Sequence, residues 1–172
     1  IDSFLESMEY DLNNSFCNEK AYKKYVAGSA EAVGLMCLQI FTNSKKGLYK
    51  ELKPYAEALG SAFQKINFLR DMKDDYQDLN RVYFPNLDIK NFNNTEKKII
   101  EHDIAQDFEK GLTGIMLLDK DAKKGVYLAY KYYMSLFQKI KKIDADKILK
   151  QRIRISNFKK ILILISSQIK PI

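Results

Sequence analysis

The sequence has little of what turns, crosslinks and metal clusters are usually made from. Its 172 residues contain seven glycines, three prolines, two cysteines, one histidine and no tryptophan. Scarce glycine and proline leave little material for turns, and long stretches rich in Lys, Glu, Leu and Ile run between them, so the composition predicts an all-α chain. The lone His102 excludes histidine-based zinc clusters, and no nucleophile elbow for a catalytic triad is present.

Cysteines and apolar runs are also limited. Cys17 and Cys37 do not form a CxxC pair and no secretory leader is seen, so we expect reduced core thiols and a cytoplasmic setting. The longest late apolar run, residues 161–165, is far shorter than the roughly 20 residues that span a bilayer. It predicts at most peripheral association with the inner face of a membrane.

Acidic residues are outnumbered, because 29 Lys and Arg against 22 Asp and Glu give a formal net charge of +7. A positive chain favours anionic partners such as diphosphates, nucleic acid or an acidic membrane surface. The sequence has no zinc-finger spacing, no glycine-rich phosphate loop and no interleaving of aromatic and basic residues. We therefore expect no nucleic-acid partner.

A helix predicted from about residue 52 to 79 carries most of the chemistry. At about 100° per residue its polar side chains share one sector that holds no cation. Like charges four residues apart cost a helix about 0.2 to 0.5 kcal/mol per pair, so this sector needs a compensating partner such as a divalent metal. The members of the sector are Gly60, Gln64, Asn67, Asp71, Asp74, Asp75 and Asp78.

Mg²⁺ is the metal that this pattern favours. Asn67, Asp71 and Asp75 lie one turn apart and offer the hard oxygen ligands that Mg²⁺ takes together with substrate phosphates. Arg70 and Arg81 carry guanidinium groups suited to phosphate oxygens. From spacing alone, an ordinary polar helix face remains the alternative.

A second acidic pair, Asp103 and Asp107, lies between lysines in the sequence and is interpreted as structural.

The small residues from 25 to 34 fit either tight helix packing or a cavity wall. Thr95 is the expected N-cap of its helix, and residues 81–85 are expected to be extended because Pro85 disfavours helix before it. The other helices are expected over residues 1–12, 19–41, 96–111, 119–143 and 145–167.

Five stretches of the sequence together resemble a known family. Gln64-x-x-Asn67-x-x-Arg70-Asp71-x-x-Asp74-Asp75, followed by Arg81-Val82-Tyr83-Phe84-Pro85, is similar to the second aspartate-rich motif of the squalene and phytoene synthase family. Residues 8–12, 25–34 and 152–156 follow in the family's order, so the resemblance covers nearly the whole chain. The sequence of residues 28–37 is most similar to that of bacterial phytoene synthases.

The resemblance implies an all-α isoprenoid synthase fold, a partial helical bundle around a central cavity, of which residues 1–172 form the C-terminal part. It implies Mg²⁺-dependent, head-to-head coupling of two prenyl diphosphates through a cyclopropyl intermediate. Matching positions imply catalytic roles for Tyr25 and Arg70 and metal ligands at Asn67, Asp71 and Asp75. The implied substrate-binding residues are Gln64, Arg70, Arg81, Tyr133 and Arg152 for the head group, and Ala56, Leu59 and Phe63 for the hydrocarbon tail.

Phytoene synthesis from two geranylgeranyl diphosphates is the first expectation. The alternatives are a squalene or dehydrosqualene synthase that acts on farnesyl diphosphate, and a non-catalytic subunit that binds prenyl diphosphate. Glu31 replaces a common glycine, Ala27 a common aromatic residue and Asp74 a common glutamate. The family's first aspartate-rich motif is not found, so we expect the complete protein to be the enzyme and this chain alone to be inactive or nearly so.

Overall fold

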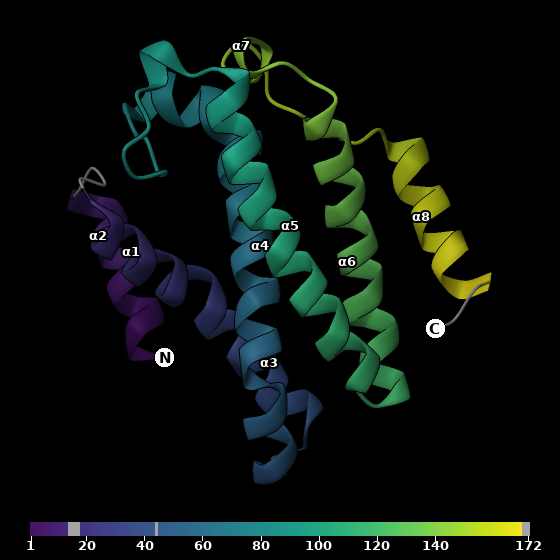
Figure 1. Ribbon diagram of the computed structural model, residues 1–172. Coiled ribbons are helices and arrows are strands. Elements are labelled where there is room, and N and C mark those ends of the chain that lie inside the picture. The colour runs from purple at the N-terminus through teal and green to yellow at the C-terminus, as the bar shows by residue number, and fades with distance from the viewer. Residues whose placement is uncertain (14–17, 44, 170–172) are drawn as a thin grey trace.

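A long helix, α4 (Lys46–Leu79), organises the fold of this computed structural model (Figure 1). The structure describes residues 1–13, 18–43 and 45–169, and within these ranges no strand occurs, which confirms the all-α class. The remaining elements are α1 (Asp2–Asn13), α2 (Glu19–Val26), the π-helical η1 (Ala27–Glu31), α3 (Ala32–Phe41), the 3-10 turn η2 (Ile89–Asn91), α5 (Asn94–Leu117), α6 (Lys120–Lys141), α7 (Ala145–Ile148) and α8 (Asn157–Ile169).

The core lies where α4 meets α5 and α6. Ala62, Ile66 and Leu69, spaced three and four residues apart on α4, are fully buried. Burying one such aliphatic side chain contributes about 1.5 to 3 kcal/mol, so this stripe holds the three helices together. Its partners in the same cluster include Ile104, Phe108, Leu136, Phe137 and Ile140.

Helix α5 approaches α4 closely through a glycine. A Cβ on Gly114 would lie only 2.2 Å from Tyr55 Cβ. The expectation that the helix ends near Gly111 is wrong, because α5 continues to Leu117 and its glycines face α4 instead of breaking the helix. The sequence pattern alone does not distinguish a glycine that ends a helix from a glycine that allows two helices to pack closely.

Two helix starts also differ from expectation. The N-cap of α5 is Asn93, whose side chain accepts from the backbone of Glu96 in a capping box, and not Thr95. Helix α4 begins at Lys46, six residues before the expected start, and tolerates Pro54 near its first turns.

The single long helix expected over residues 145–167 is wrong. Only α7 and α8 are helical, and the chain between them is irregular. Ile153 and Ile155 are buried while Arg152 and Arg154 are exposed, an alternation typical of extended chain. Extended backbone lets this segment bury two isoleucines and still present Arg152 to α4.

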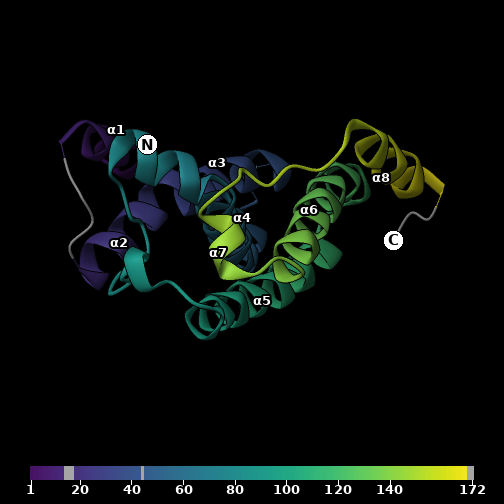
Figure 2. The same cartoon turned by 90° about the horizontal axis from the view of Figure 1, so that it is seen from above.

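Figure 2 shows how the ends of the molecule are placed. Helices α1 and α2 lie at one edge, and α8 lies at the opposite edge beyond α6. No helix of the described ranges is long and apolar enough to cross a bilayer. Cys37 on α3 is exposed, so the expectation of a core thiol is wrong there, and Cys17 lies outside the described residues.

Candidate functional site

The expected metal-binding residues lie on one face of α4. Asn67, Asp71 and Asp75 follow one another at four-residue intervals and are all partly buried. Two arginines hold Asp71. Arg70 donates from Nε to Asp71 Oδ1 at 2.9 Å, and Arg152 Nε lies 2.7 Å from the same oxygen.

Arg152 reaches this face from a distant part of the sequence. The backbone N–H of Ile153 donates to the Arg70 carbonyl at 3.4 Å, and the Ile153 side chain is buried, so the chain is anchored directly after Arg152. A second nitrogen of Arg152 lies 3.7 Å from Asp74 Oδ2. The expectation of a face without cations is therefore wrong, since two guanidinium groups compensate its carboxylates.

Asp75 forms no ion pair of this kind with a described arginine or lysine. Burial, followed by the neighbouring charge of Asp71, raises the pKa of Asp75 from 3.8 to about 6. Arg81 and Arg152 lower this pKa and Asp74 raises it, but the arginines do not restore an ordinary value. Burial and the charge of Asp71 both disfavour the ionised form of Asp75, and a bound cation would favour it.

The residues present fit Mg²⁺ as part of a coordination shell. Asn67, Asp71 and Asp75 supply the hard oxygen atoms that Mg²⁺ prefers, and they lie on one face of α4 at four-residue intervals. Among the described residues, no group of three or more Asp, Glu, His or Cys side chains is placed to hold a metal ion by itself. Diphosphate oxygens and water would have to complete the shell, and Asp71 would have to exchange an arginine for the metal.

Asn67 joins the acidic face to the aromatic residues next to it. The hydroxyl of Tyr133 donates to Asn67 Oδ1 at 3.4 Å, and Asn67 Nδ2 lies 3.5 Å from Gln64 Oε1. The ring of Tyr133 stacks on Phe63 with centroids 4.0 Å apart. The structure therefore brings Gln64, Asn67 and Tyr133 together.

An apolar cavity of about 520 Å³ begins next to these residues. Ala56, Leu59, Phe63 and Gln64, all expected to bind substrate, line it from α4. The opposite walls come from small or apolar residues of other helices. Those of η1 and α3 agree with the cavity-wall reading of residues 25–34, whereas the sequence assigned the wall residues of α5 and α6 to no site. These walls include Ser29, Ala30, Val33 and Gly34 from η1 and α3, Gly111, Gly114 and Ile115 from α5, and Ala122, Gly125, Val126 and Ala129 from α6.

Tyr25 and Arg81 form a second group on the other flank of Asp75. The Tyr25 hydroxyl donates to Asp11 Oδ1 at 3.0 Å, and an Arg81 nitrogen lies 3.5 Å from the same oxygen. Arg81 also donates to the Asp11 carbonyl. Burial and then the charge of Asp11 raise the pKa of Tyr25, so its hydroxyl stays protonated at neutral pH. Sequence reasoning gave Asp11 no role, although it lies within residues 8–12 of the resemblance.

Glu31, the departure from the family's glycine, lies outside the apolar cavity. It lines a separate polar cavity of about 970 Å³ together with Ser61 and Lys65. Burial, and then Glu57 and Asp107, raise the pKa of Glu31. We find no contact through which Glu31 would narrow the apolar cavity.

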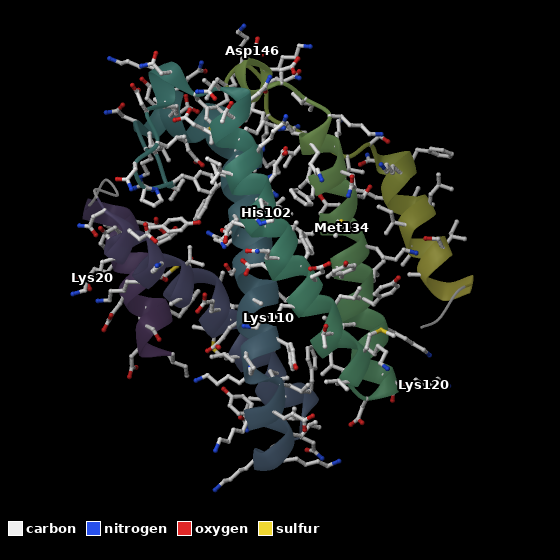
Figure 3. All side chains as sticks on the ribbon, viewed as in Figure 1. Lys20, His102, Lys110, Lys120, Met134 and Asp146 are labelled. Carbon is white, nitrogen blue, oxygen red and sulfur yellow. The ribbon has the colours of Figure 1, made fainter. Side chains whose placement is uncertain are left out.

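Asp103 and Asp107 hold the buried Lys65. Its ammonium lies 2.5 Å from Asp103 Oδ2 and 2.7 Å from Asp107 Oδ2, which supports their structural interpretation. Burial lowers the pKa of Lys65, but the hydrogen bonds to both carboxylates outweigh it and leave the pKa raised. His102 lies exposed on α5 beside Gln106 (Figure 3) and does not join the acidic face of α4.

Comparison with known proteins agrees with this geometry. A family model described as squalene/phytoene synthase matches residues 1–159. The chain belongs to the squalene/phytoene synthase family. It has the all-α isoprenoid synthase fold of that family, whose members are transferases that act on prenyl diphosphates.

Two relatives are informative. The chain is 25% identical to the 4,4'-diapophytoene synthase of Staphylococcus haemolyticus over 173 residues, which cover 91% of the chain and 59% of the relative. It is 35% identical to the hydroxysqualene synthase of Zymomonas mobilis over 82 residues, which cover 47% of the chain and 26% of the relative. The chain thus spans less than two thirds of the length of the relatives that it matches.

Proposed function

We propose that this chain binds a prenyl diphosphate with Mg²⁺ and forms part of a synthase that joins two such molecules head to head. One observation supports this most strongly. Helix α4 carries the acidic face with its arginines, around Asp71, and the wall of an apolar cavity, which meet at Phe63 and Gln64. A diphosphate with a long hydrocarbon tail has the same division into a charged head and an apolar tail.

In this proposal the head group of the substrate binds beside Asp71. Arg70 and Arg152 donate to diphosphate oxygens, which accept the paired hydrogen bonds that guanidinium groups form best. Mg²⁺ held by Asn67, Asp71 and Asp75 supplies charge neutralisation for the departing diphosphate. The tail lies along Ala56, Leu59 and Phe63, where apolar walls exclude water from a developing allylic cation.

Tyr25 is proposed to face the reacting centre as a hydrogen-bond donor, which requires its one hydroxyl proton to turn from Asp11 to the diphosphate. Its raised pKa keeps the hydroxyl protonated, and Asp11 and Arg81 fix its direction. A neutral hydroxyl stabilises a nearby anion such as the departing diphosphate without supplying a competing negative charge.

Two substrates are considered. The resemblance of residues 28–37 to bacterial phytoene synthases favours geranylgeranyl diphosphate and carotenoid synthesis. The names of the relatives, 4,4'-diapophytoene synthase and hydroxysqualene synthase, favour a squalene-type reaction of farnesyl diphosphate. Mass spectrometry of the product separates the two by carbon number.

The test measures binding and turnover separately. We expect the chain to bind radiolabelled geranylgeranyl or farnesyl diphosphate in the presence of Mg²⁺, and Asp71→Asn to weaken this binding. We expect no turnover by the 172-residue chain alone and turnover by a protein that includes the family's first aspartate-rich motif. Absence of Mg²⁺-dependent binding would contradict the proposal, and turnover by the chain alone at the full rate would contradict the expected inactivity.

A further inference from the structure

The polar cavity of about 970 Å³ lies on the side of α4 opposite the apolar one. Ser61 and Lys65 line it, and at about 100° per residue they project from the opposite side of the helix to Leu59 and Phe63, which line the apolar cavity. Its other walls come from α2, η1, α5 and the chain that follows α4 (Figure 1). The proposed prenyl diphosphate site leaves this second cavity without a role.

The walls of the polar cavity are acidic, although the chain as a whole is basic. Asp103 and Asp107 hold Lys65, and Glu19 pairs with Lys23 at 2.8 Å, so neither lysine offsets the other carboxylates. Walls of this charge attract a cation. Five acidic residues and two lysines line the cavity, a net charge of −3 against +7 for the whole chain, and the acidic ones are Glu19, Glu31, Glu96, Asp103 and Asp107.

The hydroxyl of Tyr22 is a second and independent sign of a ligand. The Tyr22 side chain is 9% exposed, and its ring lies 6.0 Å from that of Phe84, yet no hydrogen bond within the described residues uses the hydroxyl. Buried hydroxyl groups normally have a partner. Burial, and then the charges of Asp103, Asp107 and Glu19, raise the pKa of Tyr22. These three carboxylates all line the cavity, so the hydroxyl faces it.

Glu31 is another polar group of the cavity wall that has no partner among the described residues. It is half-buried, and no ion pair or hydrogen bond there uses its carboxylate. Burial, and then the charges of Glu57 and Asp107, raise the pKa of Glu31, although Lys65 and Lys110 lower it. The ionised form of Glu31 is therefore disfavoured, and a cation beside it would favour that form.

We propose that this cavity binds an aliphatic polyamine. Its ammonium groups donate to the carboxylates of Glu31 and Asp103, and the hydroxyl of Tyr22 accepts a further N–H bond. The methylene groups between them lie along Ile99 and Ile100, which form an apolar part of the same wall. This inference does not rest on the proposed enzymatic function.

A polyamine fits the cavity better than other cations do. Among the described residues, no three acidic, histidine or cysteine side chains are placed to hold a metal ion. The carboxylates come from α2, η1 and α5, so they are spread around the space, and several ammonium groups on one flexible chain match this spread. A quaternary ammonium ion has no N–H group to donate to them. The volume lies within the range of about 300 to 1,000 Å³ that is usual for small-molecule sites.

The test is calorimetric titration of the 172-residue chain with spermidine at constant ionic strength. We expect saturable binding, and binding of tetramethylammonium that is at least tenfold weaker because this ion donates no hydrogen bond. Glu31→Gln should weaken spermidine binding about tenfold, since it removes a charged acceptor, and Tyr22→Phe about fivefold, since it removes a neutral one. Tyr22→Phe should leave the free energy of unfolding unchanged, because the hydroxyl has no partner in the fold, and this separates a lost ligand contact from a damaged structure.

Two further variants serve as controls. Glu109→Gln removes the same charge from an exposed position of α5 outside the cavity and should bind spermidine as the wild type does. Asp71→Asn should also keep wild-type affinity for spermidine, although we expect it to lose affinity for prenyl diphosphate. No binding by the wild-type chain, wild-type affinity in both Glu31→Gln and Tyr22→Phe, or an equal loss in Glu109→Gln would overturn the proposal. So would a loss confined to Asp71→Asn, which would assign the polyamine to the acidic face of α4.

Discussion

Arg152 Nε lies 2.7 Å from Asp71 Oδ1, and this contact joins the segment before α8 to the middle of α4. Arg70 donates to the same carboxylate oxygen, so one aspartate is shared by two guanidinium groups. A diphosphate that arrives with Mg²⁺ offers each partner a replacement, with phosphate oxygens for the arginines and the cation for Asp71. Binding of the proposed ligand would therefore exchange these ion pairs.

The first prediction concerns Arg152. Arg152→Gln should weaken binding of inorganic pyrophosphate in the presence of Mg²⁺ by about 10- to 100-fold, because hydrogen bonds between charged groups contribute about 1.5 to 3 kcal/mol. Isothermal titration calorimetry measures the change. Arg154→Gln is the matched control, since Arg154 lies two residues away, is exposed and forms no ion pair with a described residue. If the wild type and Arg152→Gln bound pyrophosphate with equal affinity, Arg152 would not be part of the binding site.

The second prediction concerns pH. Because the pKa of Asp75 rises from 3.8 to about 6 on folding, the folded chain binds more protons than the unfolded chain between these values. The free energy of unfolding without metal should therefore fall as pH rises from about 4 to about 6. Asp75→Asn should remove this slope, and urea unfolding at a series of pH values measures it.

A control for the pH experiment lies on the same helix. Asp78→Asn, at an exposed position of the last turn of α4, should keep the wild-type slope. Mg²⁺ should bind more weakly below pH 6, because protonation of Asp75 competes with the metal. A wild-type slope in Asp75→Asn would mean that another group titrates in this range.

The third prediction concerns the contact of α4 with α5. Gly114→Ala should destabilise the protein by about 1 to 3 kcal/mol, because its Cβ would lie 2.2 Å from Tyr55 Cβ and force the helices apart. Gly125→Ala is the control, since nothing lies within 4 Å of its added Cβ and alanine is favoured over glycine in helices by about 1 kcal/mol. In denaturant unfolding, the free energy of unfolding should fall in Gly114→Ala and rise in Gly125→Ala. Equal changes in the two variants would contradict the packing described.

The fourth prediction concerns the buried Lys65. Lys65→Met should lower the free energy of unfolding by about 2 to 3 kcal/mol, less than for a fully buried ion pair, because Asp103 is 55% exposed. Lys110→Met, at an exposed position of α5, should change it by less than about 0.5 kcal/mol. A tolerated Lys65→Met would show that the two aspartates do not need this counter-ion.

The sequence predicted the elements whose signal is local. The acidic face from Asn67 to Asp75 and the apolar stripe of Ile66 and Leu69 follow from helical spacing, and both lie on α4 as expected. The predicted helix end at Gly111 was wrong, because this glycine lies against Leu59 of a neighbouring helix and does not break its own helix.

Features that depend on distant residues could not be predicted. Arg152 reaches Asp71 because the segment between α7 and α8 is extended. The alternating isoleucines of this segment were predicted as helix, because no glycine or proline interrupts residues 145–167. The far walls of the apolar cavity are small residues such as Gly125 and Ala129, which have no pattern of their own. The link from Asp11 to Tyr25 likewise appears only when α1 packs beside η1.

The most direct test of the account is calorimetric titration of the chain with a non-hydrolysable prenyl diphosphate, with Mg²⁺ and with a chelator. We predict that binding requires Mg²⁺ and that Asp71→Asn weakens it at least tenfold, while Asp78→Asn binds as the wild type does. Equal affinity with and without Mg²⁺, or wild-type affinity in Asp71→Asn, would contradict a diphosphate site on the acidic face of α4.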